Sequence, residues 1–138
     1  MKSLAKGVTF GGRLPGIIVL AIIQFTVGII HVFMGFSMLL GTFTITFQIM
    51  TSTVYSVYTL IYGCLTIFFT YLFWTMKRLG WIGTIAVSIF VILADTLAVF
   101  NVFNILGIPK VASIGEIPYS IMVIASLLQH QVRSKYNE

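Results

Sequence analysis

The feature that most constrains this chain is a long stretch without charge: from Leu14 to Met76 the sequence contains no Lys, Arg, Asp or Glu. A helix needs about 20 apolar residues to cross the hydrocarbon core of a bilayer. The stretch is therefore too long for one crossing and long enough for two crossings with a connection. In the whole chain 8% of the residues are charged, far fewer than a soluble domain needs to cover its surface. We therefore expect an integral membrane protein.

Four windows of suitable length and composition lie between charged residues and turn signals. We predict helices over about 15–40, 52–74, 79–104 and 111–131. Pro15 fits the first turn of a helix, where a missing N–H costs little, and Gly41 is a stop signal. The second window is rich in aromatic and β-branched residues, but lipid forces the backbone to satisfy its own hydrogen bonds in a helix. The sequence predicts a single all-α domain, an integral membrane four-helix bundle.

The basic residues predict the orientation of this bundle. Of the 8 Lys and Arg residues, all except Lys110 fall in the N-terminal tail, the connection between the second and third helices, or the C-terminal tail. Because Lys and Arg collect in cytoplasmic loops, we expect both termini to be cytoplasmic and the protein to be multi-pass in the cytoplasmic membrane. The dispersed basic residues form no stripe for nucleic acid, and attraction to anionic lipid is their expected consequence.

Aromatic residues and the single cysteine have conventional interpretations. Trp74 and Trp81 flank the basic connection between the second and third helices, where an interfacial aromatic belt is expected. Tyr55 and Tyr58 are assigned to the corresponding belt at the other interface. Cys64 cannot form an intramolecular disulfide, and we interpret it as a small core residue of the second helix.

One face of the first predicted helix combines small and polar residues. Gln24, Gly28, His31 and Gly35 follow one another at helical spacing, and Ala21 precedes Gly28 by seven residues. Glycine and alanine let a second backbone approach closely, and Gln and His can hydrogen-bond across the contact. This face is predicted to pack against other helices instead of lipid.

Asp95 is the costliest residue in the predicted spans, because an acid at the centre of a span costs about 2.5–3.5 kcal/mol. It must therefore face protein or water. Thr84 and Ser88 share its helix face, and Asn101 lies nearer the helix end. These residues predict a polar stripe on the third helix.

His31, Asp95 and Tyr62 lie at similar depths, since each is about 13–15 Å from the outer end of its predicted helix. They could therefore form one cluster in the outer half of the bundle. In one interpretation Asp95 accepts hydrogen bonds from His31, Tyr62 or Ser88, or is protonated, and the network fixes the helix register. In the other, the acid and the imidazole form a proton or cation site. The sequence leaves both open.

The sequence offers no established motif for metal binding or catalysis. His31, Asp95 and Cys64 are nominal ligands, but no HxxxH, ExxH or CxxC spacing is present, and His130 belongs to the opposite side of the membrane. We interpret Glu116 as an acid near the start of the fourth helix, where it suits the positive helix end. No metal, no cofactor and no catalysis are expected.

Several motifs resemble known families. The residues that carry the first likeness are Arg13-Leu14-Pro15-Gly16, Ile17 to Ile22, Tyr62-Gly63, Phe73 to Arg78, Trp81, and Ile121 to Tyr136. Over nearly the whole chain they resemble the small, mostly uncharacterised four-helix membrane proteins of archaea and bacteria. The Gln, Gly, His, Gly stripe of the first helix is similar to that of the CD20-like tetraspan family. Neither resemblance implies a catalytic residue.

The expected function is non-catalytic. With 138 residues in four helices, we expect a structural or accessory subunit of a larger membrane complex, for example a respiratory or monooxygenase-type enzyme, or a homo-oligomer. The expected partners are other membrane subunits, further copies of the chain, and lipid. The alternative is a small oligomeric channel or transporter in which Asp95 and His31 carry protons or cations.

Overall fold

The computed structural model describes residues 14–41, 53–100, 102 and 109–136, and in these parts the regular structure is entirely helical. The helices are α1 (Pro15–Leu39), α3 (Thr53–Trp74), α4 (Arg78–Val99), α5 (Lys110–Leu128) and the short α6 (His130–Lys135). The four longer helices are long and apolar enough to cross a membrane. The prediction of an all-helical chain with four such helices is confirmed for the described residues.

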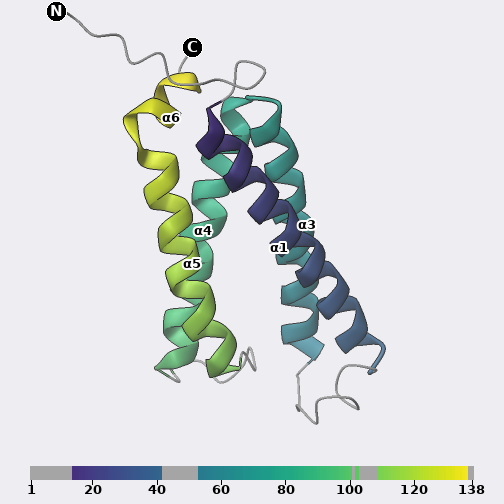
Figure 1. Cartoon of the computed structure of the whole chain (residues 1–138). Coiled ribbons are helices and arrows are strands. Elements are labelled where there is room, and N and C mark those ends of the chain that lie inside the picture. Colours follow the sequence, from purple (N-terminus) through teal and green to yellow (C-terminus); the bar gives the residue numbers. More distant parts are fainter. Residues whose placement is uncertain (1–13, 42–52, 101, 103–108, 137–138) are drawn as a thin grey trace, which may run out of the picture.

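The four long helices run up and down, and they pack as two pairs that α3 and α4 join (Figure 1). α1 lies along α3, and α5 lies along α4. One end of the bundle holds the start of α1, the turn between α3 and α4, and α6. We call it the turn end. The other, where α1 and α4 end and α3 and α5 begin, we call the loop end.

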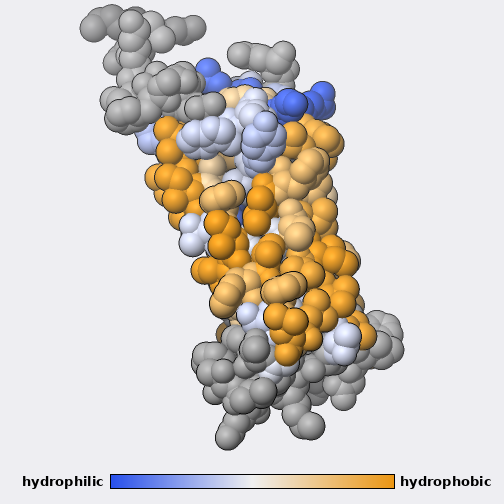
Figure 2. Space-filling view, turned by 90° about the vertical axis from the view of Figure 1, so that its right-hand side faces the viewer, coloured by the Kyte–Doolittle hydropathy of each residue, from blue (hydrophilic) through white to orange (hydrophobic). Residues whose placement is uncertain are grey.

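The sides of the bundle are apolar. Figure 2 shows a wide belt of hydrophobic side chains on one face, with hydrophilic side chains gathered at the turn end. Among the large apolar side chains, Phe33 on α1, Tyr71 on α3 and Phe90 on α4 are each at least 60% exposed. Such a surface needs lipid or another apolar partner as its surroundings.

Two helix ends differ from the prediction. α4 ends at Val99 instead of at 104, while Asn101 lies outside the described residues. The apolar sequence continues past Phe100, so hydropathy alone gave no stop signal there. The predicted fourth helix, 111–131, is also wrong at its end, because the chain leaves the helix at Gln129 with an extended ψ of 135°.

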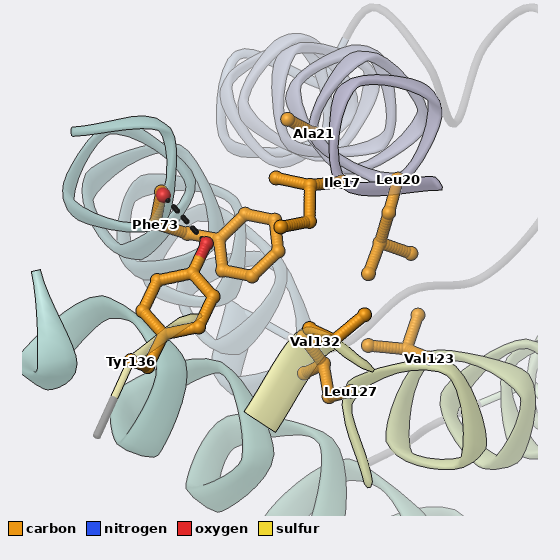
Figure 3. Close-up of a cluster of buried hydrophobic side chains, with 8 residues drawn as sticks. All are labelled: Ile17, Leu20, Ala21, Phe73, Val123, Leu127, Val132 and Tyr136. Carbon is orange, nitrogen blue, oxygen red and sulfur yellow. Dashed lines mark hydrogen bonds between the residues drawn. The ribbon is translucent and has the colours of Figure 1, made fainter. Parts of the chain in front are cut away.

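The break at Gln129 turns α6 back onto the bundle. It leaves the Leu127 carbonyl oxygen to accept a hydrogen bond from Trp81 Nε1 at 3.0 Å. Tyr136 then stacks on Phe73, with ring centroids 5.2 Å apart, and its hydroxyl donates to the Phe73 carbonyl oxygen at 2.9 Å (Figure 3). A straight continuation of α5 would leave these contacts unmade.

A hydrophobic cluster fills the turn end and joins α1, α3, α5 and α6 (Figure 3). Its buried members are Ile17, Leu20, Ala21, Phe73, Val123, Leu127, Val132 and Tyr136. This cluster anchors one end of the bundle, so the polar side chains described below lie in its middle and toward the loop end.

Glycines set the close approach between α1 and α3. A Cβ atom added to Gly35 would lie 2.6 Å from the backbone nitrogen of Leu60, and one added to Gly63 would lie 2.6 Å from that of Val32. Gly28 meets the side chain of Ile67 in the same way. The predicted packing face of the first helix thus lies against α3, where Gly63 faces it.

The turn between α3 and α4 is a Schellman motif. Lys77 N–H donates to the Leu72 carbonyl and Met76 N–H to the Phe73 carbonyl, both at 3.0 Å. Met76 occupies the left-handed position, with φ 59°, which usually takes glycine. The following Gly80 has no room for a Cβ atom against the backbone of Phe73, and this lets α4 start close to the end of α3.

Two side chains of α3 contradict the sequence interpretation. Cys64 is exposed, so the prediction of a core cysteine is wrong, because it follows Gly63 by one step around the helix and faces away from α1. Tyr55, assigned to an interfacial belt, is buried with 5% exposure. It shares the inward face of α3 with Thr59 and Tyr62, one and two turns on.

Candidate functional site: a buried acid–histidine cluster

An imidazole and a carboxyl group meet in the bundle, from the first and the last of the four long helices. His31 on α1 places Nε2 3.2 Å from Oε1 of Glu116 on α5. Its other ring nitrogen, Nδ1, lies 2.8 Å from the carbonyl oxygen of Val27, one turn earlier in α1. The ring is therefore held from both sides.

The geometry of His31 fixes where protons can be. A carbonyl oxygen can accept but not donate, so Nδ1 of His31 carries a hydrogen. A neutral imidazole with its hydrogen on Nδ1 has a lone pair at Nε2, which would repel an ionised Glu116. The contact between them therefore needs one further proton, carried either by Nε2 or by the Glu116 carboxyl group.

A second carboxyl group lies beside this pair. Asp95 on α4 is 0% exposed, and its Oδ1 accepts a hydrogen bond from the hydroxyl of Ser113 on α5 at 3.2 Å. Its Oδ2 has no hydrogen-bond partner among the described residues. Both Glu116 and His31 lie within electrostatic range of Asp95. Two carboxyl groups and one imidazole thus share one part-buried region of the bundle.

Aromatic rings of α3 cover the imidazole. Tyr62 meets His31 edge-on, with ring centroids 4.7 Å apart and planes at 89°. Tyr58 stacks against Tyr62 at 6.5 Å and against Tyr55 at 6.4 Å. The three tyrosines form a row along one face of α3, and Tyr62 is the one that contacts the imidazole.

The cluster lies toward the loop end. His31 is about 12 Å from the end of α1, Glu116 about 9 Å from the start of α5, and Asp95 about 6 Å from the end of α4, at a rise of about 1.5 Å per residue. The predicted distance of Asp95 from the end of its helix was larger, because the helix was predicted to continue to 104. The Asp95 carboxyl group is therefore closer to the loop end than the sequence indicated.

The structure brings together some of the predicted site residues and separates others. His31, Tyr62 and Asp95 lie in one region, which the depth argument had allowed. Ser88 and Gln24 instead line a cavity nearer the middle of the bundle, which Tyr62 also borders. Asn101 is outside the described residues.

Glu116 and Ser113 are the residues that the sequence interpretation missed as parts of the site. Glu116 was taken as an acid for the positive helix end, but α5 begins at Lys110 and has no acid in its first turn. The interpretation as a helix-end acid is therefore wrong. The available signal was the spacing of Ser113, Glu116 and Ser120, which puts three polar side chains on one face of α5.

No three His, Cys, Asp or Glu side chains of the described residues come together in a way that could hold a metal ion. The cluster offers groups that can hold protons. These are the His31–Glu116 contact, which needs one proton, and the carboxyl group of Asp95.

No protein-family model, curated protein or solved structure was found to match this chain. The two resemblances drawn from its sequence motifs stay predictions.

Proposed function

We propose that this chain is a membrane protein that binds and transfers protons at the His31–Glu116 pair, as the protomer of a small channel or transporter. The observation that carries the proposal is the contact between these two side chains, which needs one proton to form. Intramembrane ionisable residues commonly mark proton and ion pathways. Asp95, whose carboxyl group interacts with that of Glu116, is the second acceptor in the proposed path.

The charge distribution supports an outward-facing site. Among the described residues Lys77, Arg78, Arg133 and Lys135 belong to the turn end, and Lys110 starts α5 at the loop end. With the basic end in the cytoplasm, both termini would be cytoplasmic and the chain would be multi-pass in the cytoplasmic membrane. The cluster would then exchange protons with the outer side more readily than with the cytoplasm.

Proton flux in liposomes tests the proposal. A potential set by potassium and valinomycin would drive protons into vesicles that contain the protein and a trapped pH-sensitive dye. Wild-type protein is expected to raise the rate of acidification above that of empty vesicles. Glu116→Gln and Asp95→Asn are expected to return it toward that baseline, because each removes an acid but keeps its shape.

Lys110→Gln is the matched control, since it removes a charge from the same helix and end but outside the cluster. It is expected to leave the flux unchanged. Size-exclusion profiles identify variants that fail to assemble. A wild-type flux no faster than that of empty vesicles, or a well-assembled Glu116→Gln variant with full flux, would contradict the proposal.

A second candidate, an accessory subunit of a larger membrane complex or a homo-oligomer, has one observation in its favour. The side chains of His31 and Glu116 are still 15% and 20% exposed, and α1 and α5 are not among the helix pairs that pack along each other. A polar pair at this depth is costly next to lipid. A helix from another subunit or a second copy would complete its burial.

Native mass spectrometry of the gently solubilised protein tests this second candidate. If another chain covers the pair, the protein taken from its own membrane is expected as a discrete complex, with unrelated subunits in the accessory case and identical ones in the other. Recovery of a lone protomer across mild detergents would speak against both forms of the candidate.

A further inference from the structure

A small cavity lies near the middle of the bundle, and Tyr62, whose ring contacts His31, is part of its wall. Its volume is about 10 Å³. All four long helices contribute to its wall, with Gln24 from α1, Thr66 from α3, Thr84 and Ser88 from α4, and Tyr119 from α5. An apolar void would be the ordinary finding between membrane helices, but this wall is rich in oxygen atoms.

Four of these oxygen atoms lack a partner. Gln24 Oε1, Thr66 Oγ1, Thr84 Oγ1 and the hydroxyl of Tyr119 are buried and make no hydrogen bond with the described residues. Gln24, Thr66 and Thr84 are at most 7% exposed. One unpartnered oxygen thus comes from each long helix, and all four side chains line the same cavity.

Thr66 and Thr84 differ from other threonines of the bundle in their hydrogen bonding. A helical threonine can donate its hydroxyl to the carbonyl oxygen one turn earlier, and Thr59, Thr70 and Thr96 do so at 2.6–2.9 Å. Thr66 and Thr84 do not, although each has a carbonyl in the same position. Their hydroxyl groups therefore keep their hydrogen-bonding capacity for something inside the cavity.

We infer that this cavity is a hydration site that binds one water molecule, hydrogen-bonded to Gln24, Thr66, Thr84 and Tyr119. Its volume is about that required by one water, which needs roughly 10–15 Å³. A water molecule can donate two hydrogen bonds and accept two. It would donate to Gln24 Oε1 and to one hydroxyl, and accept from the other two hydroxyls, so that all four orphan oxygens gain a partner.

The donor set favours water over a cation. All four oxygens are neutral, and no carboxyl group lines the cavity. A cation in this position would lose its hydration without gaining a counter-charge. The inference does not depend on the proposed proton transfer, because the water serves to link four helices at a depth where unpaired polar atoms are costly.

Solid-state NMR of the protein in hydrated bilayers tests for the water directly. With threonine labelled by carbon-13, magnetisation is expected to pass from water protons to Thr66 and Thr84, although both are buried. The Thr84→Val variant is expected to weaken the transfer to Thr66, because the water loses one partner. Thr59→Val is the matched control, since Thr59 is buried on the same helix as Thr66 and its hydroxyl already bonds to the carbonyl oxygen of Tyr55. It should leave the transfer unchanged.

A thermal double-mutant cycle gives a second readout. Thr66→Val and Thr84→Val are expected to lower the midpoint temperature by less together than the sum of their separate shifts, because both act through the same water. Absence of water transfer to Thr66 and Thr84 in the wild type, or additive shifts, would overturn the inference. So would signals from these threonines that move when sodium replaces a bulky organic cation, which would indicate a bound metal ion.

Discussion

The Gly35→Ala variant is expected to lose about 2–3 kcal/mol of unfolding free energy, toward the upper end of the usual cost of overpacking. The added methyl group would lie 2.6 Å from the backbone nitrogen and 2.8 Å from the Cα atom of Leu60. Backbone atoms cannot turn aside as a flexible side chain can, so α1 and α3 must move apart. Unfolding in a titration of mild detergent with dodecyl sulfate, followed by circular dichroism, measures the loss.

Gly115→Ala is the matched control for this prediction. Gly115 is also helical, but a Cβ atom there would meet nothing within 4 Å. Alanine is favoured over glycine in a helix by about 0.5–1 kcal/mol, so the same chemical change is expected to stabilise at this position. Equal effects of the two substitutions would show that the close packing of α1 on α3 does not determine stability.

The α1–α3 contact shows what could be read from the sequence. Seven-residue spacing of Ala21, Gly28 and Gly35 identifies a face that a backbone can approach. It does not say which helix approaches, and nothing in the spacing singles out Gly63 on α3 as the facing glycine. A periodic pattern defines one side of a contact, whereas the partner depends on how two helices are rotated relative to each other.

The acid–histidine cluster was predictable to a similar extent. An imidazole and an acid in apolar helices had to find polar neighbours, because lipid offers none. The depth argument placed His31 and Asp95 at one level, but it used a predicted end of the third helix at 104, whereas α4 ends at Val99. The assignment of Glu116 to the start of a helix then removed from consideration the carboxyl group that lies nearest His31.

The central cavity could not have been predicted from residue types alone. Thr59, Thr66 and Thr70 are alike in the sequence, yet their hydroxyl groups have different surroundings. Two of them bond to their own helix, and the third faces the cavity. This difference arises from packing among four helices, which no local pattern encodes.

The His31–Glu116 pair is the second place where a single substitution should have a large effect. Removing one member of a buried ion pair and leaving the other unpaired commonly costs about 3–5 kcal/mol. The pair is not fully buried, with side chains 15% and 20% exposed, so we expect His31→Phe to cost about 3 kcal/mol, near the lower end of that range. Phenylalanine keeps a ring for the edge-on contact with Tyr62, and therefore isolates the loss of the polar contact.

The double variant His31→Phe with Glu116→Leu distinguishes the contribution of the pair to stability from that of the surrounding groups. With neither polar group present, no unpaired acid is left inside the bundle, and apolar replacements of buried ion pairs are often neutral. The double variant is therefore expected to be more stable than His31→Phe alone, in the same detergent titration. If the second substitution instead added its own full cost, Glu116 would be stabilised mainly by groups other than His31. The proton shared with His31 would then no longer be the basis of the site.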